Sequence, residues 1–222
     1  AQYCSVDVTD AEGLAEIGAN LGRKITGILH GAGLEDSKLV ADKSTDIFNK
    51  VVRVKVDGWR ALLGAVHASG NDNPSFACCF TSVAGRFGNG GQTDYAAANC
   101  ILDSEMARLT ATGTCRAVAI GWTGWRDVGM ATRGSIEAVF EAAGIETLSV
   151  EDGVSIFVDE ALAGGKRRVI GCGSLGIMNR FDVFRDAPLR LPANMSALIA
   201  DPSRFPFIDK VNNFDEGQSL IT

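Results

Sequence analysis

Short apolar runs alternate with amphipathic segments along most of the chain. The apolar runs predict strands at Gln2–Val8, Ile25–His30, Phe76–Thr81, Arg116–Gly121 and Arg168–Gly171. The amphipathic segments predict helices at Ala11–Leu21, Asp42–Val66, Thr93–Thr112, Ile136–Ala143 and Glu151–Leu162. Strands that alternate with helices predict an α/β fold with a doubly wound parallel sheet.

The run Phe76–Thr81 is almost wholly apolar, which is typical of a central parallel strand covered on both faces. A glycine-rich loop, Gly85–Gly91, follows it. Open α/β sheets bind their ligands beyond the carboxyl ends of the strands, so we expect the chemistry near this loop. After Leu175 the periodicity fades, and residues 177–222 form a tail that contains four of the five prolines.

Charge and composition exclude several classes of function. The net charge of −6 and the pI of about 5.0 disfavour nucleic-acid binding. The six cysteines form no C-x-x-C pair, which favours buried thiols in a reducing cytoplasm. With only His30 and His67 available, no metal-ligand spacing appears. No apolar stretch approaches the roughly 18 residues that a membrane helix needs.

The most informative stretch runs from Thr81 to Asn99. Ser82 ends the predicted buried strand. Tyr95 and Asn99 are four residues apart, so they share one face of the next helix, and the alanines between them allow close approach. A serine hydroxyl and a tyrosine phenol that converge above a sheet edge make a carbonyl-binding pair.

This stretch resembles the active-site motif of the short-chain dehydrogenase/reductases, specifically the ketoreductases of type I polyketide synthases. Those ketoreductases place asparagine four residues after the tyrosine and take their lysine from the preceding long helix. Here Asn99 follows Tyr95, and Lys55 lies in Val54–Gly58. The resemblance covers about residues 1–176 and implies a Rossmann-like fold. Asp36–Gly58 and Phe140–Leu148 resemble polyunsaturated-fatty-acid synthases most.

The resemblance implies NADPH as the cofactor. Three segments would contact it, namely Asp7 and Val8 at the adenine, His30, Gly31, Ala32 and Gly33 along the dinucleotide, and Trp122, Thr123 and Gly124 near the nicotinamide. From the residues alone, His30 is better explained as a structural turn residue. Asp7 also suits a helix start, where Thr9 or Asp10 can cap. The tryptophans also suit a core.

The implied reaction is hydride delivery to a β-ketoacyl thioester on an acyl carrier protein. Tyr95 would give the proton to the developing alkoxide. Lys55 would stabilise the phenolate, and Ser82 would hydrogen-bond the carbonyl. Asn99 would hold the lysine or a relay water. Tyr95 and Lys55 also have structural explanations, since a helix tyrosine usually packs and a helix lysine is usually solvated.

The glycine-rich fingerprint that cradles a pyrophosphate is absent. If the resemblance holds, Gln2–Asp7 corresponds to the third strand of the 3-2-1-4-5-6-7 order, and the first two strands lie upstream of Ala1. We then expect a gap in the visible sheet and weak NADPH binding by the 222 residues alone. Residues 1–176 would form the catalytic part of the domain, and 177–222 a linker towards a flanking synthase domain such as a dehydratase.

Two other functions remain open at this point. The chain could be a free-standing dehydrogenase for a small alcohol or sugar, although the Tyr95, Asn99 and Lys55 arrangement argues against it. It could also be a non-catalytic structural half-domain of a synthase. Such half-domains lack the serine, tyrosine and asparagine set that this chain has.

Overall fold

The computed structural model describes residues 1–129, 140–162, 164, 168–176, 211–215 and 218–221. Two compact units divide the chain, Ala1–Met178 and Asn179–Thr222. In the second unit, β5 (Val211–Asp215) and β6 (Gln218–Ile221) pair in antiparallel fashion. The candidate chemistry lies wholly in the first unit.

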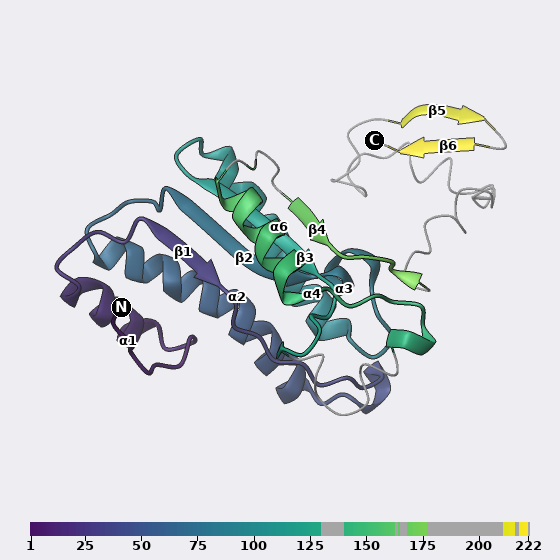
Figure 1. Cartoon of the computed structure of the whole chain (residues 1–222), viewed down its shortest axis with the longest axis horizontal. Coiled ribbons are helices and arrows are strands. Elements are labelled where there is room, and N and C mark those ends of the chain that lie inside the picture. The colour runs from purple at the N-terminus through teal and green to yellow at the C-terminus, as the bar shows by residue number, and fades with distance from the viewer. Residues whose placement is uncertain (130–139, 163, 165–167, 177–210, 216–217, 222) are drawn as a thin grey trace. The chain divides into compact units, whose positions relative to one another are not determined.

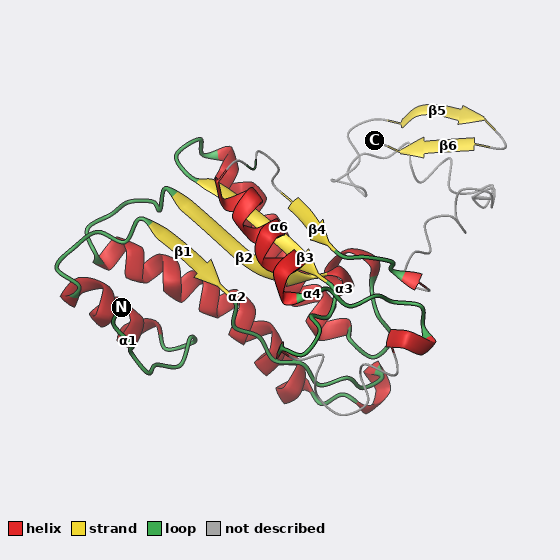
Figure 2. Ribbon diagram, in the orientation of Figure 1, coloured by secondary structure: helices red, strands yellow, loops and turns green. Residues whose placement is uncertain are grey.

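A four-stranded parallel sheet forms the centre of the first unit (Figure 2). Its strands are β1 (Gly27–His30), β2 (Phe76–Ser82), β3 (Arg116–Trp122) and β4 (Arg168–Gly171), in the order β1-β2-β3-β4. In the register of the sheet, Ser82 pairs with Trp122, and Trp122 pairs with Gly171. The carboxyl ends of the strands therefore meet at one edge, and the predicted α/β parallel sheet is confirmed.

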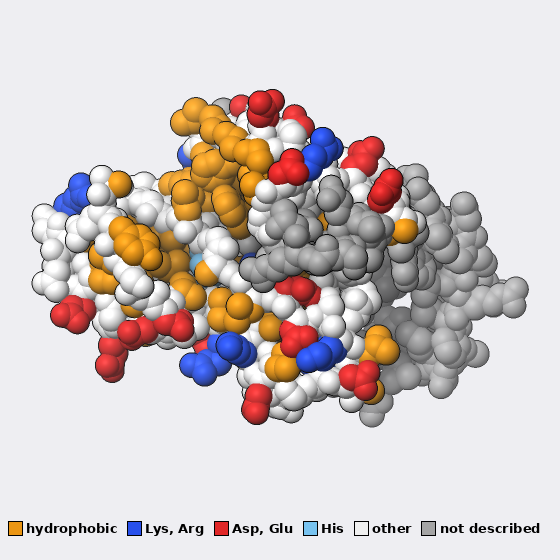
Figure 3. Space-filling view, turned by 60° about the horizontal axis from the view of Figure 1, so that its bottom comes forward, with side chains coloured by type: hydrophobic (Ala, Val, Ile, Leu, Met, Phe, Trp, Pro, Cys, Tyr) orange, Lys and Arg blue, Asp and Glu red, His pale blue; other side chains and the backbone are white. Residues whose placement is uncertain are grey.

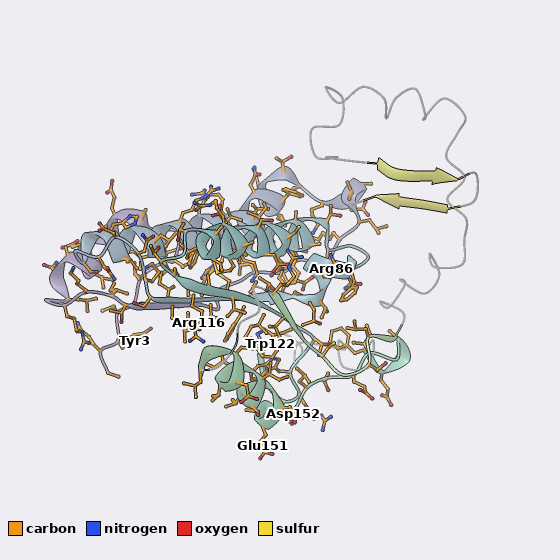
Figure 4. The ribbon with its side chains drawn as sticks, turned by 90° about the horizontal axis from the view of Figure 1, so that it is seen from above. Tyr3, Arg86, Arg116, Trp122, Glu151 and Asp152 are labelled. Carbon is orange, nitrogen blue, oxygen red and sulfur yellow. The ribbon has the colours of Figure 1, made fainter. Side chains whose placement is uncertain are left out.

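Helices cover both faces of this sheet (Figures 1 and 4). Helices α2 (Thr45–Ala68) and α4 (Thr93–Ala111) pack on one face, and α6 (Val150–Leu162) lies on the other. The remaining helices are α1 (Ala11–Asn20), the 3-10 turn η1 (Val40–Asp42) and α3 (Val83–Phe87). Asp10 caps α1 by accepting a hydrogen bond from the amide of Gly13, as the sequence predicted.

The alternation of side chains along β2 builds two cores. Cys79 packs with Trp59, Leu102 and Met106 on the α2 and α4 side, whereas Cys78 packs on the α6 side. The two thiols therefore point to opposite faces, as predicted. Burial raises the pKa of Cys78 to about 12, so this thiol stays protonated. Cys4 and Cys100, in contrast to the prediction of buried thiols, are exposed.

The predicted strand at Gln2–Val8 is wrong. Residues 1–5 are exposed, and the segment pairs with none of the described strands. An extended segment becomes a strand only when a neighbour satisfies its backbone groups. Instead, the carbonyl of Asp7 accepts a hydrogen bond from the amide of Asp10, which makes a turn into α1. The gap was predicted between this strand and the one at Ile25–His30, so it has no meaning without the former, and β1 is an edge of the described sheet.

Two other predictions need adjustment. The loop expected at Gly85–Gly91 begins instead with the short helix α3, which ends at Phe87. Half of the helix expected at Ile136–Ala143, residues 136–139, falls outside the described residues. The other predicted elements agree with the structure to within a few residues at their ends.

Apolar side chains also reach the surface of the first unit (Figure 3). Leu29 on β1 is exposed, and α6 exposes a stripe with a spacing of four residues, made by Val150, Val154, Val158 and Leu162. Exposed apolar stripes of this kind are typical of contact surfaces. None of the described elements covers this one.

We expect Gly18→Ala to loosen α1 from α2. A β-carbon on Gly18 would lie 2.3 Å from the carbonyl oxygen of Ala65, so one helix must move. Overpacking of this kind costs about 1–3 kcal/mol of local stability. Hydrogen exchange in residues 11–20 should therefore become faster. Gly64→Ala is the matched control, because no atom lies within 4 Å of the added carbon. Equal exchange rates in the two variants would contradict this packing.

Candidate active site

Ser82 lies where β2 ends and α3 begins, at the carboxyl edge of the sheet. Its hydroxyl oxygen accepts a hydrogen bond from the amide of Ala84, 3.2 Å away, so Ser82 caps α3. The hydroxyl proton remains available to donate. Ser82 therefore serves a structural purpose and still offers a hydrogen-bond donor at the edge where ligands bind.

Tyr95 and Asn99 lie on the same face of the N-terminal half of α4, and both are buried. The side-chain amide of Asn99 donates to the backbone carbonyl of Tyr95 at 2.7 Å. Burial raises the pKa of the Tyr95 phenol, while hydrogen bonding with Ser82 and Asn99 lowers it by a smaller amount. Ser82 and Asn99 therefore each lie near the phenol, which is protonated at neutral pH.

Lys55 reaches this cluster from α2. Its Nζ donates to the carbonyl of Phe80 at 3.1 Å and lies over the Tyr95 ring, 5.7 Å from the ring centroid. Burial lowers the pKa of Lys55 to about 8. The amine therefore contacts the face of the phenol ring and remains mostly charged at neutral pH.

His30 holds the end of β1 against α2. Its Nε2 donates to the backbone carbonyl of Lys55 at 2.9 Å, and its side chain is buried. Burial lowers the pKa of His30 to about 4, so the ring is neutral at pH 7. This geometry matches a structural turn residue. Beyond His30, the turn through Gly31 and Ala32 brings Gly33 against the side chain of Lys55.

The residues predicted to contact the adenine lie in the turn before α1. The carboxylate of Asp7 is exposed and accepts hydrogen bonds from the amide and the hydroxyl of Thr9, both at 2.8 Å. These bonds lower the pKa of Asp7. The methyl groups of Val8 face Gly58 on α2, at 3.0 Å from a β-carbon placed there. Asp7 therefore performs the helix-start role that the sequence also allowed.

Trp122, Thr123 and Gly124 follow the end of β3. The Trp122 ring packs edge-on against Trp125, with centroids 5.1 Å apart, and lies between the sheet and α6 (Figure 4). Two contacts fix the residues that follow. The Thr123 hydroxyl donates to the carbonyl of Glu146 at 3.2 Å, and the carbonyl of Gly124 accepts from the amide of Leu148 at 2.9 Å. The segment leaves the same sheet edge as Ser82.

One part of the site escaped the sequence reasoning. Lys43 and Asp94 form a buried ion pair, with Nζ and Oδ1 2.6 Å apart. Asp94 precedes Tyr95 directly, and its Oδ1 also accepts the Tyr95 amide at 2.8 Å. Glu35 lies close enough to raise the pKa of Tyr95 slightly. The neighbouring position of Asp94 and Tyr95 was visible in the sequence, but nothing there pointed to Lys43 as a partner.

The described residues fit one half of a dinucleotide. The Oδ1 atom of Asn99 is buried without a hydrogen-bond partner among the described residues, which is unusual for a buried acceptor. With the cation of Lys55 nearby, this edge suits the polar nicotinamide end. For a pyrophosphate, the fit is missing, since no described strand leads through a glycine-rich turn into the N-terminus of a long helix.

Other kinds of site find no support in the part of the chain that the structure describes. No three histidine, cysteine, aspartate or glutamate residues come together as metal ligands there. Among the described helices, none combines the length and the apolar character required to span a bilayer.

Comparisons with known proteins identify the family. The family model of the KR domain matches residues 1–127, more than half of the chain. The chain is 34% identical over 163 residues to "Polyketide synthase ThaG" of Burkholderia thailandensis, covering 69% of the chain and 3% of that protein. It is 33% identical over 159 residues to a polyunsaturated fatty acid synthase polypeptide of Thraustochytrium sp., covering 69% of the chain and 5% of that protein.

A solved structure agrees with these relatives. A ketoreductase domain from the bacillaene assembly line superposes with a TM-score of 0.67 and is 25% identical. The match covers 80% of this chain and 44% of that chain, so the present chain spans less than half of the solved domain and a few per cent of the curated relatives. Sequence, fold and the grouping of Ser82, Tyr95, Asn99 and Lys55 lead to one identification: the chain belongs to the KR family, the ketoreductase domains of polyketide and fatty-acid synthases.

Proposed function

We propose that this chain carries the catalytic residues for NADPH-dependent reduction of a β-ketoacyl thioester to the β-hydroxyacyl form. The substrate would be carried by an acyl carrier protein within a multidomain polyketide or fatty-acid synthase. One observation supports this most strongly: the Lys55 amine lies over the Tyr95 ring, 5.7 Å from its centroid, although α2 and α4 are distant in sequence. The flanking synthase domains are proposed as further partners, because the relatives are synthases.

Tyr95 and Ser82 would act on the substrate carbonyl oxygen. The Tyr95 phenol is protonated at neutral pH, so it can donate its proton to the developing alkoxide. The Ser82 hydroxyl oxygen accepts from Ala84, and its proton, which bonds the Tyr95 phenol without a ligand, would turn to hydrogen-bond the same oxygen. Two donors directed at one oxygen stabilise the negative charge that develops there.

Lys55 and Asn99 would support the phenol. With the 5.7 Å from Nζ to the ring centroid taken as the separation of the charges, the Lys55 ammonium would attract a Tyr95 phenolate by about 3 kcal/mol at an effective dielectric of about 20. This attraction makes the phenol a stronger acid as the proton leaves. Asn99 fixes the backbone of Tyr95, and its unpartnered oxygen can accept a bond from a water that returns the proton.

The nicotinamide, when bound, supplies the hydride that adds to the carbonyl carbon. Gly31, Ala32 and Gly33 beyond β1 and Trp122, Thr123 and Gly124 beyond β3 would hold this end of NADPH. Asp7 and Val8 would contact the adenine end. The preference for NADPH over NADH belongs to the proposal, and the rates with the two cofactors test it.

We expect Ser82→Ala to lower kcat for ketone reduction about 10- to 100-fold, because a hydrogen bond to a charged group contributes about 1.5–3 kcal/mol. The assay follows NADPH oxidation by the full-length protein with a β-ketoacyl N-acetylcysteamine thioester. Ser149→Ala is the matched control, because it also removes a serine that accepts from a helix amide, that of Asp152 in α6. Equal rates for the two variants would show that Ser82 acts only as a helix cap, and this result would count against the proposed function.

A further inference from the structure

A buried ion pair lies beside the candidate active site. The Nζ atom of Lys43 is 2.6 Å from Oδ1 of Asp94, and the two side chains are 3% and 0% exposed. The same Nζ donates to the backbone carbonyl of Asp36 at 2.7 Å. Most ion pairs on proteins are exposed and contribute little, so this one differs in kind from the pair between Lys38 and Asp36, whose side chains are 43% and 36% exposed.

Asp94 connects this pair to the backbone of Tyr95. Its Oδ1 accepts both the Lys43 amine and the amide of Tyr95. Gln92, the N-cap residue directly before α4, makes no side-chain capping bond, so the first-turn amides depend on other acceptors. Asp94 supplies one of them, with a negative charge at the positive end of the helix. The carboxylate thus fixes the helical turn that carries the phenol.

Two weaker contacts join the same two segments as the ion pair. The side-chain amide of Gln92 donates to Glu35 at 3.2 Å, and the backbone amide of Lys38 donates to the carbonyl of Gly91 at 3.0 Å. The segment from Glu35 to Lys43, which follows the turn beyond β1, is therefore fastened to residues 91–94. Both segments flank the candidate site.

Stability alone is a weak reason to bury such a pair. Removing two charges from water is costly, and apolar residues of similar size often hold a fold equally well. A buried pair is instead satisfied in only one geometry, because the unpaired charges are costly in every other arrangement. Such a pair is suited to holding a neighbouring residue in place to within a fraction of an ångström.

We propose that Lys43 and Asp94 are positioning residues for the reaction: the pair fastens the segment after β1 to the first turn of α4 and so sets the position of the Tyr95 phenol relative to Ser82 and Lys55. This inference rests on the proposed ketone reduction. Neither residue needs to touch the substrate.

The test compares Lys43→Met, Asp94→Asn and the double variant in the full-length protein, with Lys38→Met as the matched control in the same segment. We expect each single variant to lower kcat by up to about 100-fold, the loss that an error of 1 Å in position can cause. The rate is expressed per NADPH-binding site, so molecules that fail to fold do not count. The KM for NADPH should stay within about twofold, because the pair acts on the phenol.

The double variant shows whether the two residues act as a unit. If they do, it should be no slower than the slower single variant, because the first substitution already breaks the pair. If kcat in the double variant falls by the product of the two fold-decreases seen in the single variants, the inference is overturned. Single variants whose kcat per site equals that of Lys38→Met would overturn it as well.

Hydrogen exchange distinguishes a failure of this inference from a failure of the proposed function. In Asp94→Asn, exchange in residues 34–43 and 92–99 should become faster, and it should be unchanged in Lys38→Met. If the wild-type protein reduces no β-ketoacyl thioester, the proposed function fails, and faster exchange in both segments still supports the fastening. Unchanged exchange in Asp94→Asn overturns the fastening whatever the activity.

Discussion

Tyr95→Phe is expected to lower kcat for ketone reduction about 10³-fold, within the range that general acid catalysis contributes. The substitution removes only the phenolic oxygen. The ring packs with Val51 and Ala84, and phenylalanine preserves these contacts. Binding of NADPH and the stability of the fold should therefore change little, and the loss should fall on the proton transfer.

Tyr3→Phe gives the matched control, since Tyr3 is the only other tyrosine of the chain and is 88% exposed. Its rate should equal that of the wild type. Ketone reduction by Tyr95→Phe at more than about a tenth of the wild-type rate would show that another group donates the proton. The proposed mechanism would then be wrong even though the family assignment stands.

Lys55→Met is expected to change activity and stability in opposite directions. The rate of reduction should fall about 100-fold, because the attraction between ammonium and phenolate of about 3 kcal/mol is lost. Methionine has a similar length and no charge, so it can occupy the buried space. Lys50→Met on the same helix is the control, because Lys50 is exposed.

The stability effect follows from the pKa of Lys55, which burial lowers from 10.5 to about 8. The unfolded chain holds this proton more tightly than the folded one, so the charge opposes folding at every pH below about 8. The penalty is on the order of 3 kcal/mol, and it fades as the pH rises from about 8 to about 10.5. Lys55→Met removes this penalty, but it also removes the hydrogen bond to the carbonyl of Phe80, which reduces the gain in stability by about 1 kcal/mol.

Denaturant unfolding at two pH values separates the penalty of the buried charge from the effect of the lost hydrogen bond. Lys55→Met should unfold at higher denaturant concentration than the wild type at pH 7, and this advantage should vanish near pH 10.5. In the wild type, kcat should decline as the pH rises through about 8, where the ammonium loses its proton. A less stable Lys55→Met at pH 7 would show that the charged amine stabilises the fold, contrary to this prediction.

The sequence predicted the elements of this fold well where periodicity had a physical cause. The apolar run Phe76–Thr81 and the helical repeat that contains Lys55 reflect burial against neighbours that are present. Gln2–Val8 also has a strand-like pattern, but pairing depends on a neighbouring strand, and no short pattern reports whether one exists. The position of Ser82 followed from the rule that ligands bind beyond the carboxyl ends of parallel strands, and the shared face of Tyr95 and Asn99 followed from their spacing of four residues.

The ion pair between Lys43 and Asp94 could not be predicted in the same way. The two residues are 51 positions apart, and each alone looks like a solvated charge. Their burial depends on how the segment after β1 folds back on α4, which is a property of the tertiary structure. Electrostatic contacts of this kind leave no periodic signal in one sequence.

The turn beyond β1 has a consequence for how far the amine of Lys55 can extend. A β-carbon on Gly33 would lie 3.1 Å from Cε and 3.3 Å from Nζ of Lys55, so bare backbone forms a stop for the end of that side chain. Any larger residue at position 33 would displace the ammonium group of Lys55 or force the turn away from it. The length of the Lys55 side chain and the glycine at position 33 therefore depend on each other, and a change in one requires a change in the other.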